Sequence, residues 1–104
     1  MNPQIRSIWD GRGQRPLEVV STSVFDKDIK KLDKHERKEL KDLLDKISEQ
    51  PEIGKPMEHY ANVFSKRTEH RRLIWKVKKQ EGMILLLMYK NRDDVYEELK
   101  RLKI

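Results

Sequence analysis

A chain of 104 residues, 40% of them charged, has room for one domain with one small core and not for a second domain. The sequence has no cysteine, which excludes disulfides and thiolate metal sites and is typical of proteins in a reducing compartment. No apolar run approaches the length that spans a bilayer, and the N-terminus lacks the apolar core of a signal peptide, so we predict a cytoplasmic protein without a membrane partner.

The first 16 residues are predicted to be an extension that precedes the domain. Residues 1–16 contain few apolar side chains and a glycine-containing turn, and we interpret them as an extra edge strand or a loose arm. The domain itself is expected over residues 17–104. Within it, residues 17–24 alternate and are rich in β-branched side chains, which predicts a strand. Residues 25–32 change to the apolar period of a short helix.

A second, longer helix is predicted from about residue 34 to residue 49. Asp33 and Glu36 have the spacing of a capping box, and Pro51 and Gly54 mark the end. Its apolar stripe consists of Leu40, Leu43, Leu44 and Ile47. Two helices with so short a connection are expected to form a hairpin that covers one face of a sheet.

Three strands and a final helix complete the predicted domain. The strands are expected at residues 63–68, 71–79 and 83–88, with a tight turn at Glu81 and Gly82. The third strand is apolar on both faces and should lie inside the sheet. A short helix is predicted from about Asp93, with Asn91 or Asp93 as its cap. The order predicts an α+β fold in which an N-terminal strand and a helical hairpin precede an antiparallel three-stranded meander and a short C-terminal helix.

The formal net charge of +6 is concentrated in one part of the chain. Residues 54–92 hold 10 basic and 3 acidic side chains, whereas residues 1–53 hold 11 of each. The last 12 residues hold 3 basic and 4 acidic side chains. A localised positive field indicates a site for a polyanion. The alternative is a charged surface that only keeps the protein soluble.

Several classes of enzyme are excluded by the motifs that the sequence lacks. It contains no glycine-rich phosphate loop and no Gly-x-Ser-x-Gly elbow. His35, His59 and His70 show no metal-ligand spacing, so we expect surface or structural roles for them and neither a metal nor a cofactor. The acidic residues of the two predicted helices alternate with lysines and are interpreted as a solvated face.

Basic and aromatic side chains remain as candidates for chemistry. In a meander, the start of the second strand lies beside the end of the third, so cations at these two ends should meet at one end of the sheet. The candidates are Arg71, Arg72, Lys76, Lys90 and Arg92, with Lys66, Arg67 and Tyr96 on neighbouring elements. Such a cluster suits a phosphate backbone and a stacked base, and it would also suit stabilisation of a phosphate under attack by a ribose 2′-OH. From the spacing, a site that only binds a nucleic acid and a site that also cleaves it are equally consistent with the sequence.

Four segments also share a pattern with a known family. They are residues 24–32 (VFDKDIKKL), Gly54-Lys55-Pro56, residues 71–77 (RRLIWKV) and residues 90–96 (KNRDDVY). With the long second helix, they resemble the RelE/ParE superfamily of toxins from prokaryotic toxin–antitoxin pairs. The likeness covers roughly residues 17–103 and implies a RelE-like fold.

The resemblance implies roles for particular side chains. RelE-type members cut mRNA in the ribosomal A site without a metal, and ParE-type members inhibit DNA gyrase. The RelE-type pattern assigns the scissile phosphate to Arg72 and the vicinity of the 2′-OH to Lys66 or, less directly, Arg67. Lys90 would stabilise or protonate the leaving oxygen, and Tyr96 would orient or stack the base.

We therefore predict a ribosome-dependent mRNA endonuclease toxin. An acidic or amphipathic antitoxin would cover its positive surface, and oligomers would form through that antitoxin. The predicted RNA-binding residues outside the reaction are Lys55, Arg71, Lys76 and Arg92. The alternatives are a gyrase inhibitor that is not a nuclease and a degenerate member that only binds its antitoxin.

Overall fold

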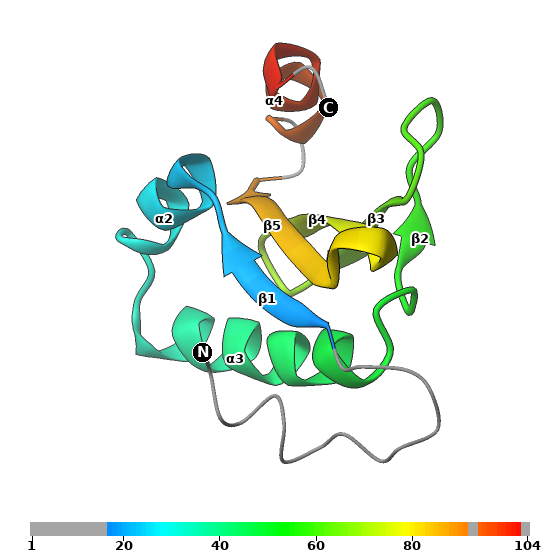
Figure 1. Ribbon diagram of the computed structural model, residues 1–104. Helices are drawn as coiled ribbons and strands as arrows, with labels where there is room; N and C mark the ends of the chain where they lie inside the picture. The colour runs from blue at the N-terminus through cyan, green and yellow to red at the C-terminus, as the bar shows by residue number, and fades with distance from the viewer. Residues whose placement is uncertain (1–16, 92–93, 103–104) are drawn as a thin grey trace.

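The computed structural model describes residues 17–91 and 94–102, so the predicted extension at residues 1–16 lies outside the described residues. The elements, in chain order (Figure 1), are β1 (Glu18–Ser21), α2 (Ser23–Ile29), α3 (Lys34–Glu49), β2 (Lys55–Pro56), β3 (Val63–Arg67), β4 (Arg72–Lys78), the 3₁₀ turn η1 (Lys79–Glu81), β5 (Met83–Lys90) and α4 (Val95–Leu102). None of the helices in these residues is long and apolar enough to cross a membrane.

The strands form a single sheet in the order β1-β5-β4-β3-β2. β3, β4 and β5 are the predicted antiparallel meander, and β1 pairs with β5 in parallel. β5 lies between β1 and β4, which confirms the prediction that the most apolar segment is inside the sheet. β2 was not predicted, because a strand of two residues that pairs only with β3 leaves no periodic pattern in the sequence.

Local capping determines where the first two helices begin. The predicted first strand was too long at its end: β1 stops at Ser21, and residues 23–24 already belong to α2. The reason is Thr22, whose hydroxyl accepts a hydrogen bond from the backbone N–H of Phe25 (3.2 Å) and so caps α2. For α3, the predicted capping box is present. The Asp33 side chain accepts from the Glu36 N–H (2.8 Å), and the Glu36 side chain accepts from the Asp33 N–H (3.3 Å).

The two faces of the sheet carry two separate cores. α3 runs across one face (Figure 1), which we call the α3 face, and the other is the α4 face. The α3 face is packed by Phe25, Leu32, Leu40, Leu43, Ile47, Phe64, Leu73, Trp75, Val77, Ile84, Leu86 and Tyr89. The α4 face is packed by Met57, Val63, Ile74, Leu87, Met88, Val95 and Leu99. Of the predicted stripe of α3, Leu40, Leu43 and Ile47 are buried, and Leu44 is partly buried against the same core.

A β-bulge in β5 changes which side chains reach each face. Trp75 pairs with Leu86, but Ile74 pairs with Met88, so Leu87 has no partner across the ladder. Side chains of a regular strand alternate between faces, and the extra residue shifts this alternation by one. Beyond the bulge, Met88 packs on the α4 face although Ile84 and Leu86 pack on the α3 face.

Gly54, in the segment that resembles the known family, has a packing reason to be glycine. A Cβ at this position would lie 2.5 Å from the carbonyl oxygen of Ser65 and 2.5 Å from the Trp75 ring. We expect Gly54→Ala to lower the free energy of unfolding by about 1–3 kcal/mol, the usual cost of overpacking. Urea denaturation measures this change.

The matched control for this prediction is Gly82→Asn. Gly82 has a φ of 69°, which asparagine tolerates, and a Cβ there would meet nothing within 4 Å. Its free energy of unfolding should therefore fall by less than about 1 kcal/mol, the part of the left-handed backbone cost that asparagine retains. A Gly54→Ala protein as stable as the Gly82→Asn protein would show that the chain before β2 can move away from Trp75.

Candidate functional site

Three cations meet where β3 ends, β4 begins and β5 ends. Arg72, the first residue of β4, is the register partner of both Arg67 in β3 and Lys90 in β5. Residues directly opposite each other on antiparallel strands project from the same face, with Cβ atoms about 4.5–5.5 Å apart. Because Arg72 is two residues before Ile74, that face is the α4 face. The structure thus brings Arg72 and Lys90 together, as the meander predicted.

Only some of the hydrogen-bond donors of the Arg72 guanidinium have a partner among the described residues. Its Nη1 donates to the hydroxyl of the buried Ser65 (2.9 Å). Its Nε is buried and has no hydrogen-bond partner among the described residues, and none of their carboxylates lies within ion-pair distance of Arg72. A buried donor without a partner costs about 1–3 kcal/mol, so this arrangement is typical of a group that awaits an anion. Arginine matches phosphate with two parallel N–H donors.

Lys90 differs from Arg72 because its charge is compensated. Its Nζ donates to Oδ1 of Asp28 (2.6 Å), and Oδ2 of the same carboxylate accepts from the backbone N–H of Tyr89 (2.9 Å). Asp28 belongs to α2 and is only 8% exposed. The expectation that acidic residues of the predicted helices form a solvated face is therefore wrong for Asp28. The missed signal was an acid in the last turn of a short helix, where the helix dipole disfavours it.

Arg71 and Arg72 point to opposite faces, since neighbouring residues of an extended chain do so. The Arg71 Nε donates to Glu36 of α3 (2.9 Å), and its guanidinium carbon lies 5.8 Å from the centre of the Tyr89 ring. The hydrogen bond from Arg71, together with the backbone bond from Asp33, lowers the pKa of the Glu36 carboxyl. Arg71 thus ties the start of β4 to α3, away from Arg72.

The two candidates on β3 are also separated. Lys66 pairs with Leu73 and shares the α3 face with Phe64, whereas Arg67 lies beside Arg72 on the α4 face. Of these two, Arg67 is therefore the member of the cluster around Arg72. Lys66 is not placed to accept a proton beside Arg72.

The remaining candidates are spread along the molecule. Lys76 lies on the α4 face two positions beyond Ile74, and Lys55 is exposed on the edge strand β2. Tyr96 is the second residue of α4 and is 56% exposed, while its neighbour Val95 is buried. Arg92 and the proposed cap Asp93 lie outside the described residues.

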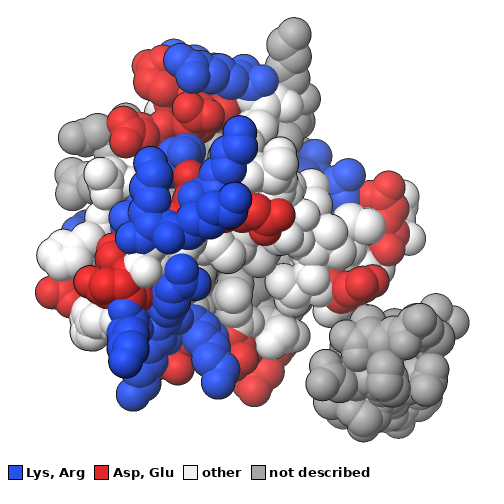
Figure 2. All heavy atoms as spheres, turned by 90° about the vertical axis from the view of Figure 1, so that its left-hand side faces the viewer, with Lys and Arg blue, Asp and Glu red and all other residues white. Residues whose placement is uncertain are grey.

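The positive surface also includes residues outside the basic segment 54–92. Residues 27–41 hold seven cations, all exposed: Lys27, Lys30, Lys31, Lys34, Arg37, Lys38 and Lys41. The four carboxylates of the same stretch each bind a group of the protein. Asp28 binds Lys90, Asp33 caps α3, Glu36 binds Arg71, and Glu39 accepts from the backbone of the β3–β4 loop. Figure 2, which views the side of the molecule where α2 lies, shows Lys and Arg side chains over much of this face.

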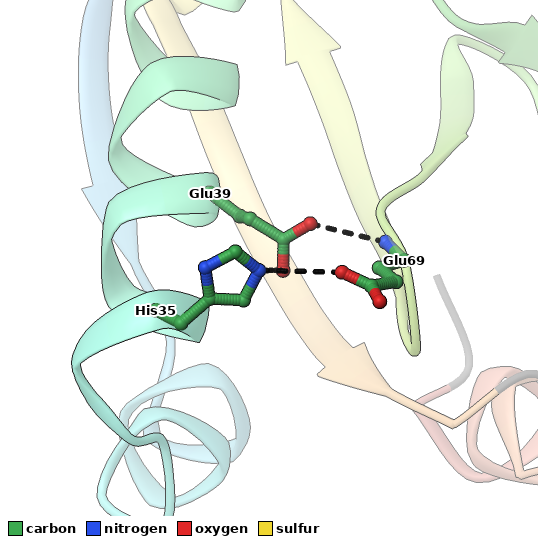
Figure 3. A group of neighbouring side chains, drawn as sticks. All are labelled: His35, Glu39 and Glu69. Atoms are coloured by element: carbon green, nitrogen blue, oxygen red, sulfur yellow. Dashed lines mark hydrogen bonds and ion pairs between the residues drawn. The ribbon is translucent and has the colours of Figure 1, made fainter.

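His35 takes part in a group that sequence spacing did not reveal (Figure 3). Its Nε2 lies 3.2 Å from Oε2 of Glu69 and 3.8 Å from Oε1 of Glu39, and Glu39 also accepts from the Glu69 N–H (3.3 Å). The three ligand atoms lie within 4.8 Å of one another, so they could hold a divalent cation. Their described contacts tie α3 to the loop between β3 and β4.

Both carboxylates act on the imidazole. The hydrogen bond to Glu69, with the negative charge of Glu39, raises the pKa of His35 above its usual value of about 6.5. This contact therefore stabilises the fold below that pH and is lost as the pH rises through the higher folded-state pKa. NMR titration of the His35 ring should give a midpoint above the usual value.

Substitution of the acidic partner tests the cause of this shift. Glu69→Gln should move the midpoint of His35 back toward the usual value. Glu58→Gln, which removes an exposed carboxylate beside His59, is the matched control and should leave it unchanged. If Glu69→Gln leaves the midpoint in place, the described contact does not exist in solution.

The solved structures that are similar to this chain include three toxins. The isolated RelE toxin of Escherichia coli superposes with a TM-score of 0.67 at 18% identity, covering 85% of this chain and 99% of that one. RelE in the RelB–RelE antitoxin–toxin complex of Methanococcus jannaschii gives 0.62 at 19%, covering 76% and 96%. The YoeB/ParE toxin of Agrobacterium tumefaciens gives 0.65 at 18%, covering 73% and 99%. No protein-family model and no curated protein sequence matches the chain. At these identities, the likeness shows a shared fold.

Proposed function

We propose that this chain, which has the RelE-like α+β fold, is the toxin of a toxin–antitoxin pair and cleaves mRNA on the ribosome without a metal. The observation that carries the proposal is Arg72. Its guanidinium is partly buried at the sheet end and has an unsatisfied Nε, and Lys90 is its register partner on the neighbouring strand. This arrangement suits a phosphodiester, which carries one negative charge and accepts paired N–H donors.

The reaction that fits is attack of a ribose 2′-oxygen on the adjacent phosphorus. The 2′-oxygen forms a bond to phosphorus as the 2′-OH loses its proton, and the bond from phosphorus to the 5′-oxygen breaks. Arg72 binds the non-bridging oxygens, on which negative charge increases. Lys90 donates a hydrogen bond to the departing 5′-oxygen, which takes up a proton from solvent. Donors fixed before the reaction stabilise such charge strongly.

None of the described side chains beside Arg72 is suited to accept the proton of the 2′-OH. Lys66 lies on the α3 face, and the neighbour Arg67 is a guanidinium, which does not lose its proton in proteins. We therefore assign charge stabilisation to the protein and transfer of the 2′-OH proton to solvent. A cleavage rate that rises with pH, without a plateau from a side-chain base, is expected.

The test is cleavage of mRNA on programmed ribosomes by purified toxin in the presence of a chelator. Cut mRNA at the A-site codon supports the proposal. The second candidate is inhibition of DNA gyrase without nuclease activity. It is favoured by the compensated charge of Lys90 and by the absence, among the described residues on the α4 face, of a side-chain base beside Arg72. Intact mRNA with inhibited supercoiling would replace the nuclease by this candidate, and inactivity in both assays would leave a protein that only binds a partner.

An antitoxin is the partner expected for this function. RelE proteins of similar fold were crystallised with the antitoxin RelB. We propose that an acidic or amphipathic antitoxin segment covers the exposed cations of residues 27–41 and the sheet end, and that oligomers form through it. Opposite charges accelerate association, so the association rate should fall as salt rises while the dissociation rate changes little. Stopped-flow mixing with the protein of the neighbouring gene measures both rates. An association rate independent of salt would contradict a charge-guided interface.

A further inference from the structure

Asp28 occupies a position that helix stability does not explain. It lies in the last turn of α2, a helix of 7 residues, where a negative charge meets the negative end of the helix dipole. Aspartate also has a poor helix propensity. The compensation comes from β5, because both carboxylate oxygens accept hydrogen bonds from the last two residues of that strand. The side chain is therefore fixed by the end of β5.

Without Asp28, the cations at the sheet end would have no negative side chain of the described residues paired with them. Arg72 and Lys90 are direct register partners on the α4 face, and like charges in such positions repel. Arg71 does not add to this repulsion, since its guanidinium pairs with Glu36 on the α3 face. Among the described residues, the Asp28 carboxylate is the one that forms an ion pair inside this cluster.

The pair also fixes the position of the Lys90 ammonium. A lysine side chain has four rotatable bonds and samples many positions when it is free. In this structure, Nζ is held 2.6 Å from Oδ1 of Asp28. An ammonium has three N–H donors, so two remain for a ligand after this bond.

We propose that Asp28 is a positioning residue of the cleavage site: it holds the Lys90 ammonium in a fixed place at the end of β5 and offsets the repulsion between Lys90 and its register partner Arg72. This inference rests on the proposed function. It divides the roles at the site, because Arg72 supplies the uncompensated charge that binds phosphate. Lys90 supplies a donor in a fixed place for the leaving oxygen. Asp28 itself touches no reacting atom.

The test compares Asp28→Asn in two backgrounds, wild type and Lys90→Met. Asparagine keeps the size of the side chain and removes its charge. In the wild-type background, we expect the single-turnover cleavage rate on programmed ribosomes to fall by about 10²-fold, the cost of a misplaced group. The dissociation constant for an mRNA with a 2′-deoxy cleavage position should change by less than about threefold, because Arg72 keeps the phosphate contact. In the Lys90→Met background, Asp28→Asn should cause no further loss of rate.

Asp42→Asn is the matched control, since it removes an exposed carboxylate from α3, and it should cleave at the wild-type rate. Equal loss from Asp28→Asn in both backgrounds would overturn the proposal, and so would an unchanged rate. A loss that appears only as weaker mRNA binding would also contradict a positioning role.

Urea unfolding of the free proteins separates this inference from the proposed function. The effects of Asp28→Asn and Lys90→Met on the unfolding equilibrium constant should be non-additive by at least about threefold, as for residues in contact. If wild-type protein does not cleave mRNA, the proposed function fails and the positioning role falls with it, while this coupling still decides whether the pair exists. Additive effects would show that Asp28 and Lys90 do not form this ion pair in solution.

Discussion

Arg72→Ala should lower the rate of mRNA cleavage on programmed ribosomes by about 10²–10³-fold, the usual effect of removing one fixed donor from a developing oxyanion. The physical reason is the environment of the guanidinium. It is partly buried, it donates to Ser65, and it faces no carboxylate of the described residues, so its field is directed at a ligand. Arg72→Lys should recover only part of the activity, because an ammonium cannot form the two parallel bonds of a guanidinium.

Loss of folding must be excluded for the Arg72 variants. Arg72→Met removes the buried Nε that has no partner but also the donor to the buried Ser65 hydroxyl, so these two effects should partly cancel and leave the free energy of unfolding within about 1 kcal/mol of wild type. The matched control for activity is Arg101→Ala, an exposed arginine of α4 that pairs with Glu98. A stable Arg72→Met protein that still cleaves at more than about a tenth of the wild-type rate would contradict the role of Arg72.

Leu86→Ala should destabilise the protein by about 2–5 kcal/mol, the range measured for truncation of a buried leucine. Leu86 is 3% exposed, lies opposite Trp75 on the α3 face and belongs to the strand between β1 and β4. Neighbouring strands and α3 restrict collapse around the lost side chain, so a cavity should remain. Urea denaturation measures the change, and the slope of the transition should stay constant if only stability is affected.

Val19→Ala is the control for the core prediction, because Val19 lies on the edge strand of the same sheet and is 38% exposed. Its cost should be within about 1 kcal/mol. Equal and small effects of the two substitutions would mean that β5 is not the centre of the core. A large effect of Leu86→Ala alone is expected.

Local signals in the sequence were sufficient for much of the fold. The capping box of Asp33 and Glu36 and the apolar stripe behind it predict α3, and both are present. The alternation of β4 and the apolar run of β5 predict two paired strands, because side-chain period and turn residues act over a few neighbours. The meander then requires Arg72 and Lys90 to meet at one end of the sheet.

What the sequence could not determine is the face on which each cation lies and the partner that it finds. Lys90 shares a face with Arg72 only because a bulge at Leu87 shifts the alternation of β5 by one residue, and a bulge depends on the fit between two strands and two cores. Asp28 reaches Lys90 across 62 residues of sequence, and Glu36 reaches Arg71 across 35. An ion pair has no periodicity along the chain, so tertiary packing alone decides which charges are compensated and which, like that of Arg72, have no counter-charge among the described residues.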